Sequence, residues 1–409
     1  MLQRTVAALQ GIEFDAIRAT PVWRRLTAPQ SLGGTGITRP TVVAPAAWLG
    51  SWSNWLRVLP HFEHVLSDEV RRHAGQFDTS NLPTFRRLQS AWAGVERLPD
   101  LQSATCLRDE DGNMTLARLP HAPIKAQRFF AAALAQQEHK ASLFIPVGAE
   151  RHQFEGVAQA RGTSAYGGKG IMHFPVGKGS DKFLEPFAAK IMFAIKFLPT
   201  VGHLVELPPG FDTVHDLLAH GREGSHATHR AVGVEFAAML RAMGKTVVPE
   251  PRGFSMEDNK RPDFAAAGAG GNIKVCDHSV VLNLAKSYVR AAARVPGHAA
   301  DLRENEKHVK YDIALATALG PGNLIVPFAI EETGGWGTEF ATEFKEWIAQ
   351  LREEEREAGG EGWQATMTML HWQQRVARAL YSSLARRVVA RARSVQPRHQ
   401  QDAPLPGVQ

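Results

Sequence analysis

The sequence has little cysteine and no long apolar run. Its 409 residues include two cysteines, Cys106 and Cys276, too few for a disulfide framework or a cysteine-based zinc site. No run reaches the roughly 18 apolar residues that a membrane span requires, and Glu13, Asp15 and several arginines interrupt the first 25 residues. We therefore expect a soluble intracellular protein with no signal peptide and no membrane partner.

The charge balance is basic. The chain has 47 Lys and Arg against 41 Asp and Glu, a formal net charge of +6 at pH 7, and its pI is near 9.4. This balance suits a polyanionic partner, although many basic proteins bind no nucleic acid. The length allows two or three domains with a packed core.

Helical patterns fill the first half of the chain, and helices alternate with strands in the second half. Residues 160–183 read as a loop that nearly matches a phosphate-binding loop but has no Ser or Thr after its lysine. The fold class is α/β. We expect a mostly helical region over 1–200, an α/β sandwich over 201–355, a basic amphipathic helix over 363–393 and a disordered tail over 394–409.

Individual elements can be assigned along the chain. Helices are predicted over 83–95, 125–137, 228–243, 299–319 and 339–351, and strands over 246–249, 263–267, 272–282 and 324–330. The helix over 299–319 is predicted to bury Leu302, Val309, Ile313 and Leu319. The acidic run 353–357 is predicted to be a linker.

Two aspartates stand in neighbouring predicted strands. Arg261-Pro262-Asp263 opens one strand, and after thirteen further residues Asp277 lies inside the next apolar run. A charge there is costly unless it is paired or metal-bound, and carboxylates on adjacent strands can face each other at about 5 Å. The two aspartates can therefore hold a hard cation such as Mg²⁺, or Asp263 can cap a turn while Asp277 pairs with a basic residue.

Three residues of the following helix share one face. Lys307, Lys310 and Tyr311 occupy positions i, i+3 and i+4. A lysine near a bound metal can polarise the attacking water or stabilise a pentacovalent phosphate. Glu306 lies four residues before Lys310, so solvent-exposed ion pairs are an equally good interpretation.

Histidines cluster before the aspartates: His215, His220, His226 and His229. Without cysteines nearby we do not expect them to form a zinc site. His229 and Glu235 lie on the predicted helix 228–243 and can reach the aspartates instead. Glu235 is thus a candidate third carboxylate, or else a side chain of the helix surface.

Together, Arg261-Pro262-Asp263, Asp277 and the segment 307–311 resemble the restriction-like endonuclease domain of non-LTR retrotransposon reverse-transcriptase polyproteins, in the PD-(D/E)XK superfamily. Segment 325–335 is similar to the strand and turn that follow the lysine helix in that family, and segment 32–51 resembles the region after the reverse-transcriptase core. The resemblance implies a restriction-endonuclease-like fold, Mg²⁺ or Mn²⁺ as cofactor, DNA or RNA as partner, and a nuclear location if genomic DNA is the target.

The chain also departs from that family. Ser279 stands where a standard PD-(D/E)XK site has its lysine, so the lysine must come from the helix, as the retrotransposon branch allows. The family's Cys-Cys-His-Cys knuckle has no cysteines in the stretch from His215 to His229, and the adjacent aspartates of a polymerase box occur nowhere. The chain resembles a C-terminal piece of such a polyprotein that cannot polymerise.

We expect a metal-dependent endonuclease that nicks DNA. Asp263, Asp277 and Glu235 are predicted to bind the metal, and Lys307, Lys310 and Tyr311 to be catalytic. The basic helix is predicted to contact the nucleic-acid backbone through Arg375, Arg378, Arg386, Arg387, Arg391 and Arg393.

Other interpretations stay open. The basic helix can instead carry a solvated basic face while it packs through Trp372, Val376, Leu380 and Leu384. The whole protein can be a catalytically inactive nucleic-acid-binding remnant, or an α/β scaffold that binds protein partners.

Overall fold

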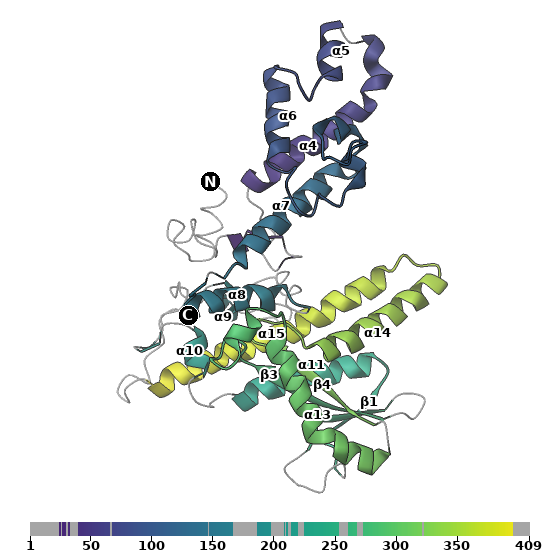
Figure 1. Ribbon diagram of the computed structural model, residues 1–409. Coiled ribbons are helices and arrows are strands. Elements are labelled where there is room, and N and C mark those ends of the chain that lie inside the picture. Colours follow the sequence, from purple (N-terminus) through teal and green to yellow (C-terminus); the bar gives the residue numbers. More distant parts are fainter. Residues whose placement is uncertain are drawn as a thin grey trace. The chain divides into compact units, whose positions relative to one another are not determined.

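The computed structural model describes residues 24–25, 27–29, 32, 40–65, 68–145, 147–166, 186–197, 208, 210–211, 214–219, 225–252, 261–267, 273–320 and 323–395. The chain forms two compact units (Figure 1). The N-terminal unit spans Arg24–Ser142, and the C-terminal unit comprises the described residues from Leu143 onwards. Residues 268–272, where the strands predicted over 263–267 and 272–282 meet, and the tail after residue 395 lie outside the described residues.

The N-terminal unit is helical. Its elements are α4 (Pro40–Val58), η2 (Leu59–Val65), α5 (Asp68–Gly75), α6 (Pro83–Ala93), η3 (Thr105–Leu107), η4 (Leu116–His121) and α7 (Ala126–Ser142). Proline suits the first position of α6, because its fixed φ fits a helix and it has no N–H to leave unpaired. Phe85, Leu88 and Trp92 then repeat on one face and pack in the core with Leu49 and Phe130. The helices predicted over 83–95 and 125–137 correspond to α6 and α7.

The C-terminal unit contains a four-stranded mixed sheet covered by helices (Figure 1). Its strands are β1 (Thr246–Pro249), β2 (Phe264–Ala267), β3 (Ile273–Val281) and β4 (Ile325–Glu331), in the order β1-β2-β3-β4. The first two pairings are antiparallel, and β3 and β4 are parallel. Its helices are α8 (Arg151–Ser164), α9 (Pro186–Phe197), α10 (Val214–Ala219), α11 (Ser225–Ala242), α12 (Val289–Ala292), α13 (His298–Leu319), α14 (Thr338–Glu357) and α15 (Trp363–Val395). The predicted α/β class is confirmed.

Helices cover the two faces of the sheet, and β3 shows how they are separated. Successive side chains of a strand point to opposite faces. Cys276 packs in the core formed by α11, α14 and α15, together with Phe236 and Phe344. Val275 packs on the other face against Tyr311 of α13. The sheet therefore separates the α13 face from the face covered by α11.

The buried face of α13 differs from the prediction. Val309 and Ile313 are 85% and 82% exposed, and Leu302 is also exposed. The residues that are buried are Ala299, Ala300, Glu304, Tyr311 and Leu315. The prediction is therefore wrong for these three residues, whereas Leu319 is partly buried against Tyr311 and Leu315. It failed because the inward face of α13 meets polar groups of β3 and of the start of α14.

The predicted domain boundary near residue 200 also differs from the structure. The C-terminal unit begins at Leu143, because α9 places Ile191 and Ile195 in the core that covers the sheet. Likewise, α8 runs to Ser164, so that the first residues of the predicted loop over 160–183 are helical; residues 167–185 lie outside the described part.

The acidic run 353–357 is part of a helix and not a linker. It forms the last turn of α14, and the Glu355 carboxylate accepts hydrogen bonds from the backbone N–H groups of Gln364 and Ala365 at the start of α15. The acidic run thus caps the next helix. Along α15 the four apolar residues Trp372, Val376, Leu380 and Leu384 are buried in the core. Among the described helices, none is both long enough and apolar enough to cross a lipid bilayer.

A pair of substitutions tests the orientation of α13. Leu315→Ala should lower the free energy of unfolding by about 2–5 kcal/mol, because Leu315 is 1% exposed. Val309→Ala, on the opposite face of the same helix, should change it by less than about 0.5 kcal/mol. Urea unfolding followed by circular dichroism measures both. A similar loss in both variants would contradict the assigned face.

Candidate functional site

Asp263 and Asp277 meet where β2 begins. The register pairs Phe264 with Cys276, so Asp263 stands one step before this pair and lies across from Asp277. The two carboxyl groups share a hydrogen bond. Asp277 is buried and Asp263 is half-buried. Two aspartates that are separated by thirteen residues in the sequence are therefore in direct contact in the fold.

Lys307 of α13 completes this group. Its Nζ lies 2.9 Å from Asp277 Oδ2, and the side chains of the two residues are 11% and 4% exposed. The Lys307 ammonium is thus an interior charge held against an interior carboxyl group. Desolvation offsets much of the attraction within such a pair, but removal of one partner leaves a costly unpaired charge in the interior.

Tyr311 and Lys310 tie α13 to the segment before β2. The Tyr311 hydroxyl donates to the Arg261 carbonyl oxygen at 3.0 Å, and Lys310 Nζ donates to the same hydroxyl at 2.6 Å. Burial, and next the Asp277 carboxyl group, raise the pKa of Tyr311 well above its ordinary value. The neutral phenol therefore works as a fixed donor that positions the Arg261–Asp263 segment.

The two carboxyl groups differ in acidity. Burial, and next the hydrogen bond with Asp263, raise the pKa of Asp277 to about 6, although Lys307 opposes the shift. Burial also tends to raise the pKa of Asp263, but contacts with His278 and Asp277 lower it to well below its ordinary value. Two carboxylates in contact repel when both are ionised, so a proton or a cation between them is favoured.

His278 and His229 contact Asp263 from the α11 side of the sheet. The backbone N–H of His278 donates to Asp263 Oδ2 at 2.8 Å, and His278 Nδ1 lies 2.8 Å from the same oxygen. The His229 ring stacks on the His278 ring with centroids 3.7 Å apart. Gly233 makes room for this arrangement, because a Cβ there would lie 2.5 Å from His278 Cε1. Burial, and next His278, lower the pKa of His229 to about 4, so its ring is neutral at pH 7.

The other predicted histidines lie apart from this group. His215 is buried, with Nδ1 2.7 Å from Glu332 Oε1. Burial lowers the pKa of His215, but Glu332 outweighs that effect and raises it. His226 is exposed on α11, and His220 lies outside the described residues.

Glu235 faces α15. Its Oε2 lies 2.7 Å from Arg375 Nε, and its Oε1 lies 3.9 Å from Arg378 Nη2. In the described part of the chain, the cluster of at least three metal-ligating side chains comprises His229, Asp263 and His278 and does not include Glu235. The structure thus places the predicted third carboxylate in an ion-pair cluster between α11 and α15.

The six predicted nucleic-acid-binding arginines have different environments. Arg375 and Arg378 pair with Glu235. Arg387 and Arg391 are buried, and Arg387 Nη2 donates to the Leu218 carbonyl oxygen at 2.8 Å. Arg386 and Arg393 are exposed. Burial of two arginines follows from the course of α15, which packs against α9, α10, α11 and α14 and so has several covered faces.

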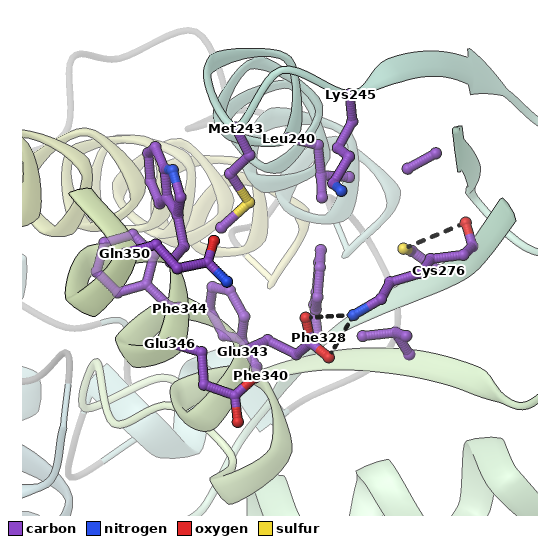
Figure 2. Close-up of a pocket in the computed structure, with 14 residues that line it drawn as sticks. Leu240, Met243, Lys245, Cys276, Phe328, Phe340, Glu343, Phe344, Glu346 and Gln350 are labelled. Atoms are coloured by element: carbon purple, nitrogen blue, oxygen red, sulfur yellow. Dashed lines mark hydrogen bonds and ion pairs between the residues drawn. The ribbon is translucent and has the colours of Figure 1, made fainter. Parts of the chain in front are cut away.

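Two hollows lie near these groups. One, of about 450 Å³, lies between α11 and α15 and is lined by Arg230, Arg386 and Arg387 among others. The other, of about 150 Å³, lies on the α11 face of the sheet (Figure 2). Figure 2 shows Met243 and Phe344 at this second hollow, and at its edge Lys274 Nζ lies 2.7 Å from both carboxylate oxygens of Glu343. Cys276 lines it, so the sheet separates it from Asp277.

Comparison with profiles of known protein families gives no match, and comparison with curated proteins gives none either.

Glu304 of α13 binds the first backbone N–H groups of α14, a contact that we call the Glu304 clamp. This contact predicts that the stability of the protein depends on pH. Glu304 is buried one turn before Lys307 and accepts backbone N–H groups of Glu339 and Phe340 at 3.0 and 3.2 Å. Burial raises the pKa of Glu304 to about 7, although these two N–H groups lower it. The folded state keeps the proton up to about pH 7, whereas the unfolded chain releases it near pH 4.5.

Stability should therefore fall by about 3 kcal/mol as the pH rises from 4.5 to 7, and level off above that. Urea unfolding at a series of pH values should show this fall reduced in Glu304→Gln. Glu306→Gln, an exposed neighbour on the same helix, is the matched control and should follow the wild type. Identical pH profiles for Glu304→Gln and the wild type would refute the clamp.

Proposed function

We propose that the C-terminal unit is a divalent-cation-dependent endonuclease that nicks DNA, with a restriction-endonuclease-like fold. The element order supports this proposal, because α11, β1, β2, β3, α13 and β4 form a helix, an antiparallel three-stranded sheet, a crossover helix and a parallel fourth strand. The observation that carries the proposal is the contact of Lys307 Nζ with Asp277 Oδ2 at 2.9 Å, beside the hydrogen bond between Asp277 and Asp263.

Asp263 and Asp277 would hold Mg²⁺ or Mn²⁺. They fit such an ion, because their carboxyl groups touch and need a proton or a cation between them, and hard cations prefer carboxylate oxygens. When bound, the ion would polarise a phosphoryl oxygen and acidify a water molecule. Glu235 would not take part, since Arg375 and Arg378 neutralise it.

Lys307 would stabilise the charge that builds up on the phosphate. Its ammonium lies at the carboxyl pair in a mostly water-excluded position, where a fixed positive charge acts strongly. A cation on the aspartates would release Lys307 to face a phosphate oxygen. Tyr311 would position the Asp263 segment through the Arg261 carbonyl, and Lys310 would support Tyr311.

The arginine-lined hollow would hold the nucleic-acid backbone. Arg230 of α11 and Arg386 of α15 are exposed at this hollow, and phosphate contacts of this kind give affinity without sequence preference. Arg230 directly follows His229, which contacts Asp263. One helix therefore links the hollow to the carboxyl pair.

Nicking of supercoiled plasmid in Mg²⁺ tests the proposal. Lys307→Ala should slow nicking by about 10²–10³-fold, as loss of a preorganised charge does, and the Asp263→Ala/Asp277→Ala double variant should abolish it. Lys274→Ala is the matched control, because Lys274 pairs with Glu343 at the hollow on the other face of the sheet. Undiminished nicking by the double variant would refute the assignment.

The second candidate function is an inactive nucleic-acid-binding remnant. Its supporting observation is that the Lys307 ammonium, 2.9 Å from Asp277 Oδ2, gives that carboxyl group a basic partner from within the chain. The same assay separates the two candidates. Salt-sensitive DNA binding by the wild type, with no nicking in Mg²⁺ or Mn²⁺, would favour the remnant.

A further inference from the structure

A second group of ligand atoms adjoins the carboxyl pair. His229, Asp263 and His278 each offer one ligand atom, and these atoms all lie within 4.8 Å of one another. Asp263 Oδ2 is 2.8 Å from His278 Nδ1 and 3.5 Å from His229 Nε2. Donor atoms that share a tetrahedral ion with bonds of about 2.1 Å lie about 3.4 Å apart. The spacing therefore suits one cation after small side-chain shifts.

The hydrogen bonds of His278 leave one of its ring nitrogens facing a carboxylate. His278 Nε2 lies 2.7 Å from the His229 carbonyl oxygen, which can only accept, so Nε2 carries the proton. In the neutral ring Nδ1 then presents a lone pair to Asp263 Oδ2, and the His278 side chain is 3% exposed. With its proton on Nε2, the ring has no hydrogen on Nδ1 to donate to that oxygen. Two opposed lone pairs in the interior need a proton or a cation between them.

The donor set determines which cation fits. We propose that His229, Asp263 and His278 bind a transition-metal dication such as Zn²⁺ or Co²⁺, at a position distinct from the one between Asp263 and Asp277. Imidazole nitrogens favour such ions over Mg²⁺, which prefers an all-oxygen shell. Three protein ligands leave a fourth position open, as in zinc sites that bind water or a substrate.

Binding requires one change of tautomer. His229 Nε2 lies 3.2 Å from the His278 carbonyl oxygen, and as a ligand it must carry its lone pair while the proton moves to Nδ1. His229 is half-buried near the start of α11, so its ring can adjust. His278 is held in place by Gly233 and by its backbone bond to Asp263.

Metal binding at this site does not depend on nuclease activity, and only the sharing of Asp263 links it to the proposed function. A carboxylate common to two ions is a known arrangement in two-metal sites. The site also explains why His278, which no sequence motif singles out, lies with both its ring and its backbone N–H against Asp263.

Titration of the metal-free full chain with Co²⁺ tests this inference. The wild type should develop visible d–d absorption that saturates at one Co²⁺ per chain and is displaced by Zn²⁺. His229→Gln should lower the Co²⁺ affinity by at least about 100-fold, since even an outer partner of a ligand contributes about 10–100-fold. His226→Gln, an exposed neighbour on α11, is the matched control and should leave the titration unchanged.

Absence of the visible bands, or equal Co²⁺ affinity in the wild type and His229→Gln, would overturn the inference and leave an imidazolium–carboxylate pair as the explanation. Loss of the bands in Asp277→Asn but not in His229→Gln would also overturn it, because the ion would then lie on the carboxyl pair. A parallel nicking assay in Mg²⁺ keeps the two proposals apart. Visible Co²⁺ bands without nicking would contradict the nuclease proposal alone. Nicking without the Co²⁺ bands would contradict the His229–Asp263–His278 site alone.

Discussion

The hydrogen bond between two carboxyl groups on neighbouring strands is the constraint on which this part of the C-terminal unit depends. A buried carboxyl pair is stable only with a proton, a cation or a basic side chain beside it. Lys307 supplies the basic side chain to Asp277, and the His278 backbone N–H and ring supply partners to Asp263. The sheet thus divides the partners, with α13 serving one aspartate and the α11 face serving the other.

This constraint explains features that hydrophobic packing alone does not. The face of α13 that meets the sheet carries Lys307 and Tyr311, and its aliphatic residues Val309 and Ile313 lie in solvent. Glu304, on the same inward face, accepts the N–H groups that begin α14. Gly337 permits that contact, because a Cβ there would lie 2.1 Å from Glu304 Oε1. Polar contacts of Glu304 with α14 and of Tyr311 with the Arg261 carbonyl therefore position α13. This position places Lys307 at the aspartates.

Local signals were sufficient to predict the strands and the convergence of Asp263, Asp277 and Lys307, because short apolar runs between Gly and Pro define strands and i, i+4 spacing defines a helix face. The positions of the other site residues depend on tertiary contacts, which the local sequence does not show. His278 reaches Asp263 through its backbone N–H and its ring, from a side chain that alternation directs away from Asp277. Arg391 and Glu304 look like surface charges in sequence, yet the packing of α15 and α14 buries them. Glu235 could not be placed without knowing that α15 crosses α11.

Asp263 and Asp277 are proposed to form one binding position for a hard cation. Thermal unfolding of the full chain with increasing Mg²⁺ tests it most directly, because an ion that binds only the folded state raises the melting temperature by mass action. We expect a Mg²⁺-dependent rise in the melting temperature of the wild type and its loss in Asp277→Asn. A melting temperature that does not respond to Mg²⁺ in the wild type, or an equal rise in both proteins, would contradict the account.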